Sequence, residues 1–360
     1  MTRTITLSID QLFRPQPGGI ATYVRGLAQG LVSLDDSSLD VVGVAPRGPV
    51  PAGATDLPLR VVRSALPLAV LTRLWPHRPF GVPRESDVVH ATSMTGPFAG
   101  GSRRAVHSIA MHDLLWRDEP SSTTPSGIRF HEQRLKLITT NEQLRILVTS
   151  PGLRERLVGL GIDGGRIVDV RFGVDDDGTT AANHDDVRGL LLKHGVVGPF
   201  TLYAGTLEPR KNIERLVAAH ALARSETPDV GDLVIAGPSG WGDVATGDAK
   251  VLGLVSRGML KGLYRDAALF AYVPRAEGFG LPPVEALHAG TRVVASTTTP
   301  SVTTNDCVVR VDPLDVDTIA HGLVTAVALN DDTESATRRR ASVADLTWRN
   351  AALDHLAGWQ

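Results

Sequence analysis

The segment 274–290, PRAEGFGLPPVEALHAG, constrains the fold more than any other part of this 360-residue chain. The apolar, β-prone residues 269–273 before it predict a buried strand, and Gly278 and Gly280 allow backbone conformations that other residues avoid. The Pro-Pro pair that follows is tolerated only where a helix opens. The segment therefore predicts a strand, a tight loop and a helix start.

The same segment has two features of a nucleotide-sugar site. Bare N–H groups at a helix N-terminus, with glycines before them, bind anions. Glu285, one turn into the predicted helix, can accept hydrogen bonds from a vicinal diol such as a ribose, and Glu277 lies eight positions before it. Nucleotide sugars carry both a phosphate and a diol. Taken alone, however, a Gly-x-Gly turn is explained about as well by a simple strand-to-helix connection.

Length and composition predict two packed domains. The chain exceeds the roughly 250–300 residues at which a single core stops growing. Hydrophobic residues make up 42% of the chain and charged residues 21%, which supplies two cores and argues against disorder. A formal net charge of −2 gives no overall attraction to nucleic acid. The single cysteine, Cys307, fits a reducing compartment.

The N-terminal residues predict a second glycine loop before a helix. Residues 5–9 alternate as a first strand, and a loop ending in Gly18 and Gly19 follows. Apolar residues then recur at spacings of three and four over 20–31, which indicates an amphipathic helix. The two glycines let main-chain amides approach a ligand closely. Only about one such loop in three binds anything, so this element is weak evidence alone.

A histidine ends the strand predicted over residues 105–113. Ligands of open parallel sheets bind beyond the carboxyl ends of the strands, so His112 is placed for chemistry. A lone histidine at a strand end is more often a local hydrogen-bonding group, and Asp113 has an alternative role as a helix cap.

A pair of cations follows the strand predicted at 200–205. Arg210 and Lys211 lie in the loop just ahead of a helix, and the whole chain has only five lysines, so ordinary surface composition explains the pair poorly. A leaving nucleoside diphosphate gains negative charge as its bond to the sugar breaks. Fixed cations at that position stabilise the transition state more than the ground state.

Together these motifs closely resemble those of the retaining glycosyltransferases of family 4, a group with the GT-B fold. The segment from Glu277 to Glu285 matches the family's E-x7-E signature, and the string GTLEPRKN at 205–212 resembles its Arg-Lys phosphate clamp. Gly18-Gly19 and His112-Asp113-Leu114 resemble its Gly-Gly and His-Asp-Leu elements. The resemblance runs over essentially the whole chain.

The resemblance implies an α/β protein in which two Rossmann-like, doubly wound parallel-sheet domains face each other across a cleft. We expect an N-terminal acceptor-side domain at 1–175, a linker leading into the second domain at 176–198 and a donor-binding domain at 199–345. A C-terminal helix at 346–360 is expected to cross back to the first domain. The acidic run after Gly173 is interpreted as a solvated linker rather than a metal site, and no metal or other cofactor is expected.

The resemblance also implies a reaction: transfer of a sugar from a nucleoside-diphosphate sugar, GDP-mannose-like or a UDP-sugar, to an acceptor hydroxyl with retention. The acceptor is a glycan, a lipid-linked molecule or a small-molecule glycoside. Arg210 and Lys211 would clamp the diphosphate, Glu285 would hold the ribose, and Glu277 and His112 would contact the sugar. The residues expected to bind the donor also include Gly18, Gly19, Gly205, Gly278, Phe279, Gly280 and Leu281.

Two departures from the family pattern support a rival interpretation. Phe172 stands where family members usually carry Asn, and residues 301–306 replace a Pro-Glu-Val segment. The second departure favours a catalytically degenerate GT-B subunit that binds a nucleotide sugar in a regulatory or scaffolding role. A sugar-nucleotide epimerase on the same fold fits less well, because the paired glutamates and the Arg-Lys pair are what the transferases show.

Residues 60–78 mix leucines and a tryptophan with arginines and a histidine. They predict a core-facing helix with a basic solvated face, and the alternative is a membrane-surface patch for a lipid-linked acceptor. No segment reaches the ~18–20 apolar residues that span a bilayer, and the N-terminus is too short and polar for a signal peptide. We expect a cytoplasmic protein, with peripheral contact at the inner face of the membrane as the alternative.

Overall fold

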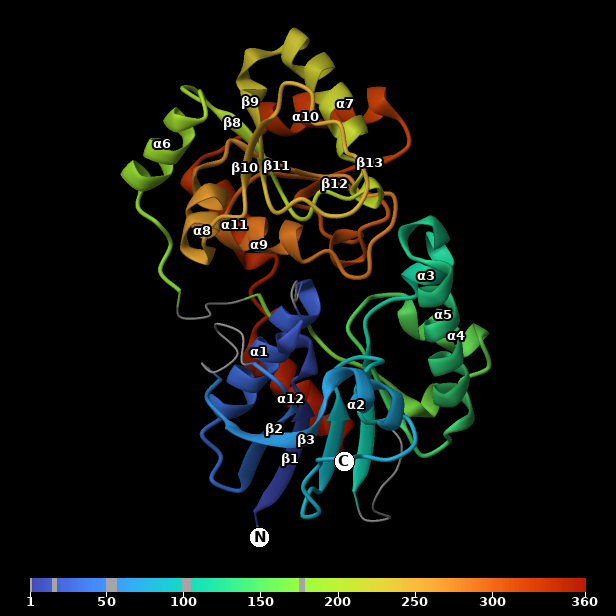
Figure 1. Cartoon of the computed structure of the whole chain (residues 1–360). Helices are drawn as coiled ribbons and strands as arrows, with labels where there is room; N and C mark the ends of the chain where they lie inside the picture. The colour runs from blue at the N-terminus through green and yellow to red at the C-terminus, as the bar shows by residue number, and fades with distance from the viewer. Residues whose placement is uncertain (1, 15–17, 50–56, 99–104, 175–178) are drawn as a thin grey trace. The chain divides into compact units, whose positions relative to one another are not determined.

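The structure is a computed structural model that describes residues 2–14, 18–49, 57–98, 105–174 and 179–360 (Figure 1). The chain folds into two compact units. The first unit comprises Met1–Trp116, Thr123–Asp175 and Asp345–Gln360, and the second comprises Arg117–Ser122 and Asp176–Ala344. The two ends of the chain therefore belong to the same unit.

The first unit contains a seven-stranded parallel sheet in the order β3-β2-β1-β4-β5-β6-β7. Ile5 of the central strand pairs with Val41 on one side and with Val88 on the other, and Ile5 is fully buried because helices cover both faces of a parallel sheet. The strand order reverses between β1 and β4, so the topological switch point lies there. The strands are β1 (Arg3–Ser8), β2 (Leu39–Arg47), β3 (Arg60–Pro67), β4 (Val88–Ala91), β5 (Val106–Met111), β6 (Arg145–Val148) and β7 (Ile167–Asp169).

The C-terminal helix α12 (Trp348–Gly358) packs against α1 (Gly18–Val32) in the first unit (Figure 1). Two glycines of α1 make this close packing possible, because a Cβ on Gly26 would lie 1.9 Å from the Trp348 ring and one on Gly30 would lie 2.1 Å from the Trp348 carbonyl oxygen. The return of the C-terminal helix to the first domain is thereby confirmed. The unit's other helices are α2 (Leu68–Leu74), α4 (Pro125–Thr140), α5 (Leu153–Gly159) and the short η1 (Asp10–Phe13) and η3 (Gly164–Arg166); α3 (Leu115–Asp118) crosses the unit boundary.

Polar contacts anchor α12 to the sheet. The Trp359 indole Nε1 donates to Ser108 Oγ at 2.8 Å, and the Arg3 guanidinium donates to the Trp359 carbonyl oxygen at 2.8 Å. An ion pair between Arg171 and Asp354 at 2.7 Å adds a third contact. The last turn of the chain is therefore part of the first unit's core.

The second unit contains a six-stranded parallel sheet in the order β10-β9-β8-β11-β12-β13, with its switch point between β8 and β11. Its strands are β8 (Phe200–Ala204), β9 (Asp232–Ala236), β10 (Lys250–Gly253), β11 (Leu269–Tyr272), β12 (Val293–Ser296) and β13 (Val308–Val311). Its helices are α6 (His184–Lys193), α7 (Ile213–Glu226), α8 (Arg257–Asp266), α9 (Leu281–Ala289), α10 (Val316–Ala328) and α11 (Thr333–Ala341), with short turns η2 (Pro120–Ser122), η4 (Pro209–Lys211), η5 (Pro228–Val230) and η6 (Pro300–Val302). Two doubly wound parallel sheets are thus confirmed.

The strand, loop and helix predicted for the 269–290 region are present as β11, a glycine loop and α9. Gly280 caps α9 with φ +92°, in the left-handed region that favours glycine. A Cβ at Gly280 would also lie 2.3 Å from Thr299 Cγ2. Gly290, with φ +89°, ends the helix in the usual left-handed cap.

The interpretation of residues 60–78 as one helix is wrong. Arg60–Pro67 forms the strand β3 at the edge of the sheet, where consecutive β-branched valines favour extended backbone, and only Leu68–Leu74 is helical. Leu71 and Trp75 are fully buried against Val44. These two apolar side chains therefore pack in the core and do not face the surface.

The range 176–198, expected to hold the linker and the entry to the second domain, contains the helix α6. This helix packs against α8 and begins at an Asn183 cap that accepts from the Asp186 N–H. The aspartates 175–177 of the acidic run lie outside the described residues. Among the helices that the structure describes, none is both long and apolar enough to cross a bilayer.

Candidate active site

The switch point of the second sheet brings together two loops that carry site residues. The loop after β8 holds Arg210 and Lys211, and the loop after β11 holds Glu277. In open parallel sheets ligands bind beyond the carboxyl ends of the strands at such a point. The fold therefore places the predicted cations and the first glutamate at one edge of the sheet.

Glu277 is the centre of this cluster. Its Oε2 accepts from Lys211 Nζ and from Tyr272 Oη, each at 2.5 Å, and lies 3.4 Å from Arg210 Nη1. Its Oε1 accepts from the Gly278 amide at 3.0 Å. The Lys211 and Glu277 side chains are each only 12% exposed, so water screens their attraction weakly.

The charges in the cluster keep Glu277 ionised. Burial by itself raises the pKa of Glu277, but the positive charges of Lys211 and Arg210, with hydrogen bonds from Lys211 and Tyr272, outweigh it and lower the pKa to about 2. Burial lowers the pKa of Lys211, and the adjacent Glu277 carboxylate opposes that change. A phosphate group that entered here would compete with Glu277 for the Lys211 ammonium.

Arg210 ties the two loops to each other. Its Nη1 donates to the Ala276 carbonyl oxygen at 2.9 Å, and its own carbonyl oxygen accepts from the Arg275 amide at 3.0 Å. Its Nη2 lies 3.4 Å from Glu208 Oε2. The guanidinium is therefore held in place before any ligand binds, which lowers the entropy lost on binding.

Asn212 fixes the backbone next to Lys211. Its structural role was not predicted from the sequence. It is buried and has φ +62°, one of two positive φ values among the described residues other than glycine. Its Nδ2 donates to the carbonyl oxygens of Val273 at 2.9 Å and Pro313 at 2.7 Å. Asn tolerates the left-handed region better than most residues, which is the only sequence signal for this role.

Glu285 belongs to a second cluster in the same unit. Its Oε1 accepts from Arg257 Nη1 at 2.6 Å and its Oε2 from Tyr264 Oη at 3.0 Å. The ring of Tyr264 packs on Phe270 at 5.2 Å, and Phe270 stacks on Tyr272 at 6.2 Å. The two predicted glutamates are thus linked through three aromatic rings. Arg257, Tyr264 and Tyr272 are partners that the sequence did not reveal.

The glycine loop before α9 is supported by the segment that departs from the family pattern. The Ser301 amide donates to the Phe279 carbonyl oxygen at 2.9 Å, and Ser301 Oγ donates to the Gly280 carbonyl oxygen at 2.6 Å. Leu281, the last residue predicted in this loop, is the first residue of α9. At the other loop, Gly205 follows β8 with φ +149°, and a Cβ there would lie 3.0 Å from Tyr203 Oη.

His112, Gly18 and Gly19 lie in the first unit. His112 follows β5, and its Nε2 donates to the Thr92 carbonyl oxygen at 2.9 Å, which leaves Nδ1 to accept from Thr149 Oγ1 at 3.3 Å. Burial lowers the pKa of His112, although Thr92 and Asp113 oppose the change. The imidazole is therefore neutral, and both of its nitrogens already have protein partners.

Gly18 and Gly19 are the first residues of α1, so the helix begins two residues earlier than the apolar spacing indicates. Within the described part of the chain, a Cβ on either glycine would meet no atom within 4 Å. Gly18 has φ +59°, whereas Gly19 has no positive φ that would require glycine. Among the described residues, none fills the space over this helix start.

A buried chain of hydrogen bonds lies beside His112, and no sequence pattern predicts it. Tyr23 Oη lies 2.8 Å from His90 Nε2 and 2.7 Å from His355 Nε2, and the Tyr23 ring meets His112 edge-on at 4.8 Å. His90 Nδ1 lies 2.8 Å from Ser108 Oγ, which also accepts from the indole of Trp359, the residue that follows α12.

The proton positions in this chain follow from its two ends. An indole N–H can only donate, so Ser108 Oγ accepts from Trp359. A carbonyl oxygen can only accept, so His355 Nδ1 donates to Ala351 at 2.6 Å and His355 Nε2 accepts from Tyr23. Because Tyr23 has a single proton and donates it to His355, a neutral His90 donates from Nε2 to Tyr23 and accepts at Nδ1 from Ser108. Every link needs neutral imidazoles. Burial lowers the pKa of both histidines, that of His355 to about 4.

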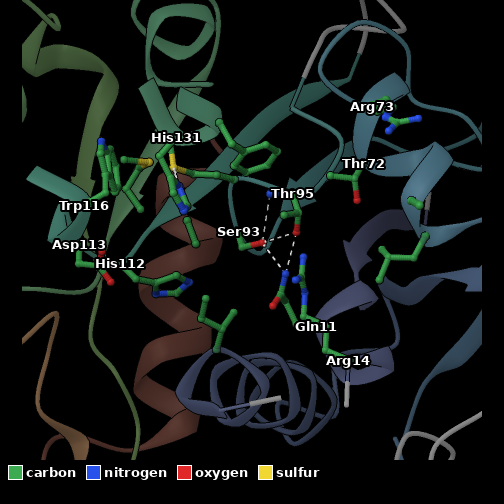
Figure 2. Close-up of a pocket in the computed structure, with 17 residues that line it drawn as sticks. Gln11, Arg14, Thr72, Arg73, Ser93, Thr95, His112, Asp113, Trp116 and His131 are labelled. Atoms are coloured by element: carbon green, nitrogen blue, oxygen red, sulfur yellow. Dashed lines mark hydrogen bonds between the residues drawn. The ribbon is translucent and has the colours of Figure 1, made fainter. Parts of the chain in front are cut away.

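His112 also lines a cavity of ≈ 800 Å³ that lies within the first unit (Figure 2). Gln11, Arg14 and Trp116 are among the other residues that line it. Among the described residues, no group of three or more Asp, Glu, His or Cys side chains is arranged to hold a metal ion.

Comparison with known proteins gives a family for the second unit. Residues 198–328 match the family described as "Glycosyl transferases group 1". O-antigen chain mannosyltransferase B of Escherichia coli is 36% identical over 164 residues, covering 42% of this chain and 43% of that protein. D-inositol 3-phosphate glycosyltransferase of Mycolicibacterium smegmatis is 34% identical over 173 residues, covering 43% of this chain and 38% of that protein. The chain thus matches less than half the length of these relatives.

Two solved structures match nearly the whole chain. Sucrose-phosphate synthase from Thermosynechococcus elongatus has a TM-score of 0.74 at 20% identity, covering 99% of this chain and 98% of that one. Anabaena HepE in complex with UDP and glucose has a TM-score of 0.71 at 16% identity, with the same coverage. Identities this low establish a shared fold alone. The whole chain therefore has the GT-B fold, and residues 198–328 of its second unit are similar to the group 1 glycosyltransferases.

Proposed function

We propose that this protein transfers a sugar from a nucleoside-diphosphate sugar to an acceptor hydroxyl with retention at the anomeric carbon. The bond between the anomeric carbon and the diphosphate oxygen breaks, and the acceptor oxygen bonds to the same face of that carbon. The proton of the acceptor hydroxyl moves to the departing phosphate oxygen. No protein nucleophile takes part.

One observation carries this proposal: the cluster of Lys211, Arg210 and Glu277 at the switch point of the second sheet. Lys211 Nζ is fixed by Glu277 and Tyr272 at 2.5 Å each, so a cation is held ready before the ligand arrives. Preorganised charge stabilises a developing anion without reorganisation in the transition state. A departing diphosphate is such an anion.

The remaining roles follow the same proposal. Arg210 and Lys211 hold the diphosphate, Glu285 holds the ribose, and Glu277 and His112 contact the transferred sugar. The amides at Gly18 and Gly19, and the loop of Gly278, Phe279 and Gly280, approach the donor without obstruction by a Cβ. Gly205 and Leu281 line the donor from their loops.

We propose GDP-mannose-like or UDP-sugar donors, and a glycan, lipid-linked or small-molecule acceptor. The relative in Escherichia coli is named a mannosyltransferase, and the HepE structure holds UDP and glucose. The single cysteine fits a reducing compartment, so we place the protein in the cytoplasm, and peripheral contact with the inner face of the membrane is the alternative location.

Product analysis tests the proposal. The protein is incubated with GDP-mannose or UDP-glucose, with and without a mixture of sugar and polyol acceptors, and nucleotide release and new glycosides are followed by mass spectrometry. We expect acceptor-dependent release of one nucleoside diphosphate and a product with the donor's anomeric configuration, read by NMR. A product of inverted configuration, or release without any dependence on Lys211, contradicts it.

The segment 301–306 favours a second candidate function. The Ser301 amide donates to the Phe279 carbonyl oxygen, and the Ser301 hydroxyl donates to the Gly280 carbonyl oxygen. The segment contains no glutamate, whereas the family pattern has one there. This favours a nucleotide-sugar-binding GT-B subunit without turnover. Tight binding of a nucleoside diphosphate, with neither donor hydrolysis nor transfer, would identify that function.

A further inference from the structure

The cavity of the first unit has two chemically different sides (Figure 2). Arg14 and Arg73 lie on one side, with Gln11 and Thr72 beside them. Trp116 and His131 lie on the other side, near His112. The volume of ≈ 800 Å³ is within the range of small-molecule sites.

On the cationic side, the positive charges of Arg14 and Arg73 have no ion-pair partner among the described residues. In addition, Arg14 Nε is buried without a hydrogen-bond partner among those residues. A buried N–H of a guanidinium that lacks a partner is costly, so such a group favours a ligand acceptor. Arg73 lies on α2, is exposed, and lines the cavity.

A third arginine lies beside the cavity, because the Arg134 guanidinium donates to the carbonyl oxygen of Thr72. Arg134 of α4 is buried, lies over the Phe130 ring at 4.8 Å, and has an Nη1 without a partner among the described residues. Asp10, whose Oδ2 accepts from the cavity residues Gln11 and Thr95, is fully buried, and burial raises its pKa although the hydrogen bond from Thr95 and the charge of Arg14 oppose the change. Asp113 lies on the opposite side, and its Oδ1 accepts from the Leu115 amide at 3.0 Å.

The aromatic side is held rigid. The Trp116 and His131 rings stack at 4.7 Å with an interplanar angle of 15°, and the Trp116 Nε1 donates to Glu132 Oε1 at 2.7 Å. His131 Nδ1 lies 3.4 Å from the Met94 sulfur. A fixed aromatic surface beside a polar group suits the C–H face of a sugar or polyol ring.

We propose that this cavity binds the acceptor, and that the acceptor is a sugar or polyol carrying a phosphate monoester. Arg14 and Arg73 hold the phosphate, and the ring lies against Trp116 with a hydroxyl toward His112. A phosphate monoester carries about −1.5 to −2 charge near pH 7, which suits two arginines better than a single carboxylate does. The inference rests on the proposed transferase function, because it names the class of acceptor.

Calorimetric titration of the ligand-free protein tests the inference without any donor. The probes are mannose 6-phosphate and inositol 1-phosphate, each compared with mannose and inositol. The variants are Arg14→Gln and Arg73→Gln, with Arg60→Gln as the control of equal charge, because Arg60 is 51% exposed on β3 and pairs with Asp40 outside the cavity. We expect at least a tenfold loss of affinity in both cavity variants and none in the control.

A second arm separates a soluble phosphate from a lipid phosphate. Vesicles of phosphatidylcholine with and without phosphatidic acid are sedimented with the wild type and with Arg73→Gln, whose exposed position leaves folding intact. Binding of either phosphate that depends on Arg73 supports the inference and identifies the source. Equal binding of the neutral sugars, equal binding by the cavity variants, or no binding of any phosphate overturns it. Nucleotide binding, measured separately, reports on the proposed function by itself.

Discussion

Lys211 Nζ lies 2.5 Å from Glu277 Oε2, across 66 residues of sequence. The contact joins the loop after β8 to the loop after β11 at the switch point of the second sheet. Because the pair is largely buried, the attraction is strong and the ammonium has little freedom. The proposed stabilisation of the leaving diphosphate depends on this preorganised ammonium group of Lys211.

Lys211→Ala should lower kcat/KM by about a hundredfold or more, because a fixed cation is removed from the developing charge. The matched control is Lys193→Ala, which removes an exposed lysine at the end of α6. Steady-state kinetics on both variants, with melting temperatures to verify folding, make the comparison. Near wild-type turnover of the Lys211 variant would count against the diphosphate role.

Asn212 should be replaceable by glycine at a smaller cost than by alanine. Both substitutions remove the hydrogen bonds to Val273 and Pro313, but only alanine strains the backbone at φ +62°. We expect Asn212→Gly to lose about 1–3 kcal/mol of unfolding free energy and Asn212→Ala about 1 kcal/mol more. Urea denaturation measures both. Equal stabilities would show that the backbone conformation carries no cost.

Gly19→Ala should separate binding from stability. A Cβ at Gly19 meets no described atom within 4 Å and the residue has no positive φ, so the free protein should keep its melting temperature. The added methyl group would occupy the space through which the α1 amides approach the donor. We predict a rise in donor KM without a change in stability. Unchanged donor kinetics would remove this loop from the site.

Two helical glycines should respond in opposite directions. Gly26→Ala places a Cβ 1.9 Å from the Trp348 ring and should weaken the packing of α12 on α1 by several kcal/mol. Gly189→Ala, in the middle of α6, meets nothing described within 4 Å and should stabilise by about 0.5–1 kcal/mol through helix propensity. Thermal unfolding of the two variants tests this. A neutral Gly26→Ala would contradict the described α1–α12 contact.

Stability should fall in mild acid because of His355. Its pKa is about 4 in the folded protein, owing to burial, and about 6.5 when unfolded. The unfolded state therefore binds the proton first, so the contribution is complete above pH 6.5 and is lost as the pH falls toward 4. The expected size is about 3 kcal/mol.

Replacing the histidine isolates this effect. His355→Leu should flatten the pH dependence of the unfolding free energy between pH 6.5 and 4, although the variant is less stable overall. The exposed His77 provides the control, since His77→Leu should leave the slope unchanged. Urea denaturation at a series of pH values gives the slopes. Equal slopes in the wild type and the His355 variant would refute the assignment.

The sequence predicted the parts of the site whose signals are local. Gly280 and Gly290 bracket α9 through backbone angles that few other residues adopt, and the proline pair marks its start. The Arg210-Lys211 pair stands out against a chain with few lysines. Local signals also predicted the edge of the sheet where these groups meet, because carboxyl ends of parallel strands share one edge.

The parts that sequence could not predict depend on contacts between distant residues. Tyr23 and His355 are 332 positions apart, and no local pattern links a tyrosine in α1 to a histidine in the last helix. Glu285 is bound by Arg257 and Tyr264 of α8, which are 28 and 21 positions away in the sequence, so no local pattern predicts these contacts either. The strand β3 has no clear sequence signal, because buried and exposed side chains do not alternate regularly along this strand at the sheet edge.

Calorimetric titration of GDP and UDP into the wild type and into Lys211→Ala measures whether Lys211 holds the diphosphate. We predict that the wild type binds one of the two nucleotides at one site per chain, and that the substitution weakens this binding at least tenfold. Equal affinity in the variant, or no binding of either nucleotide by the wild type, would contradict it.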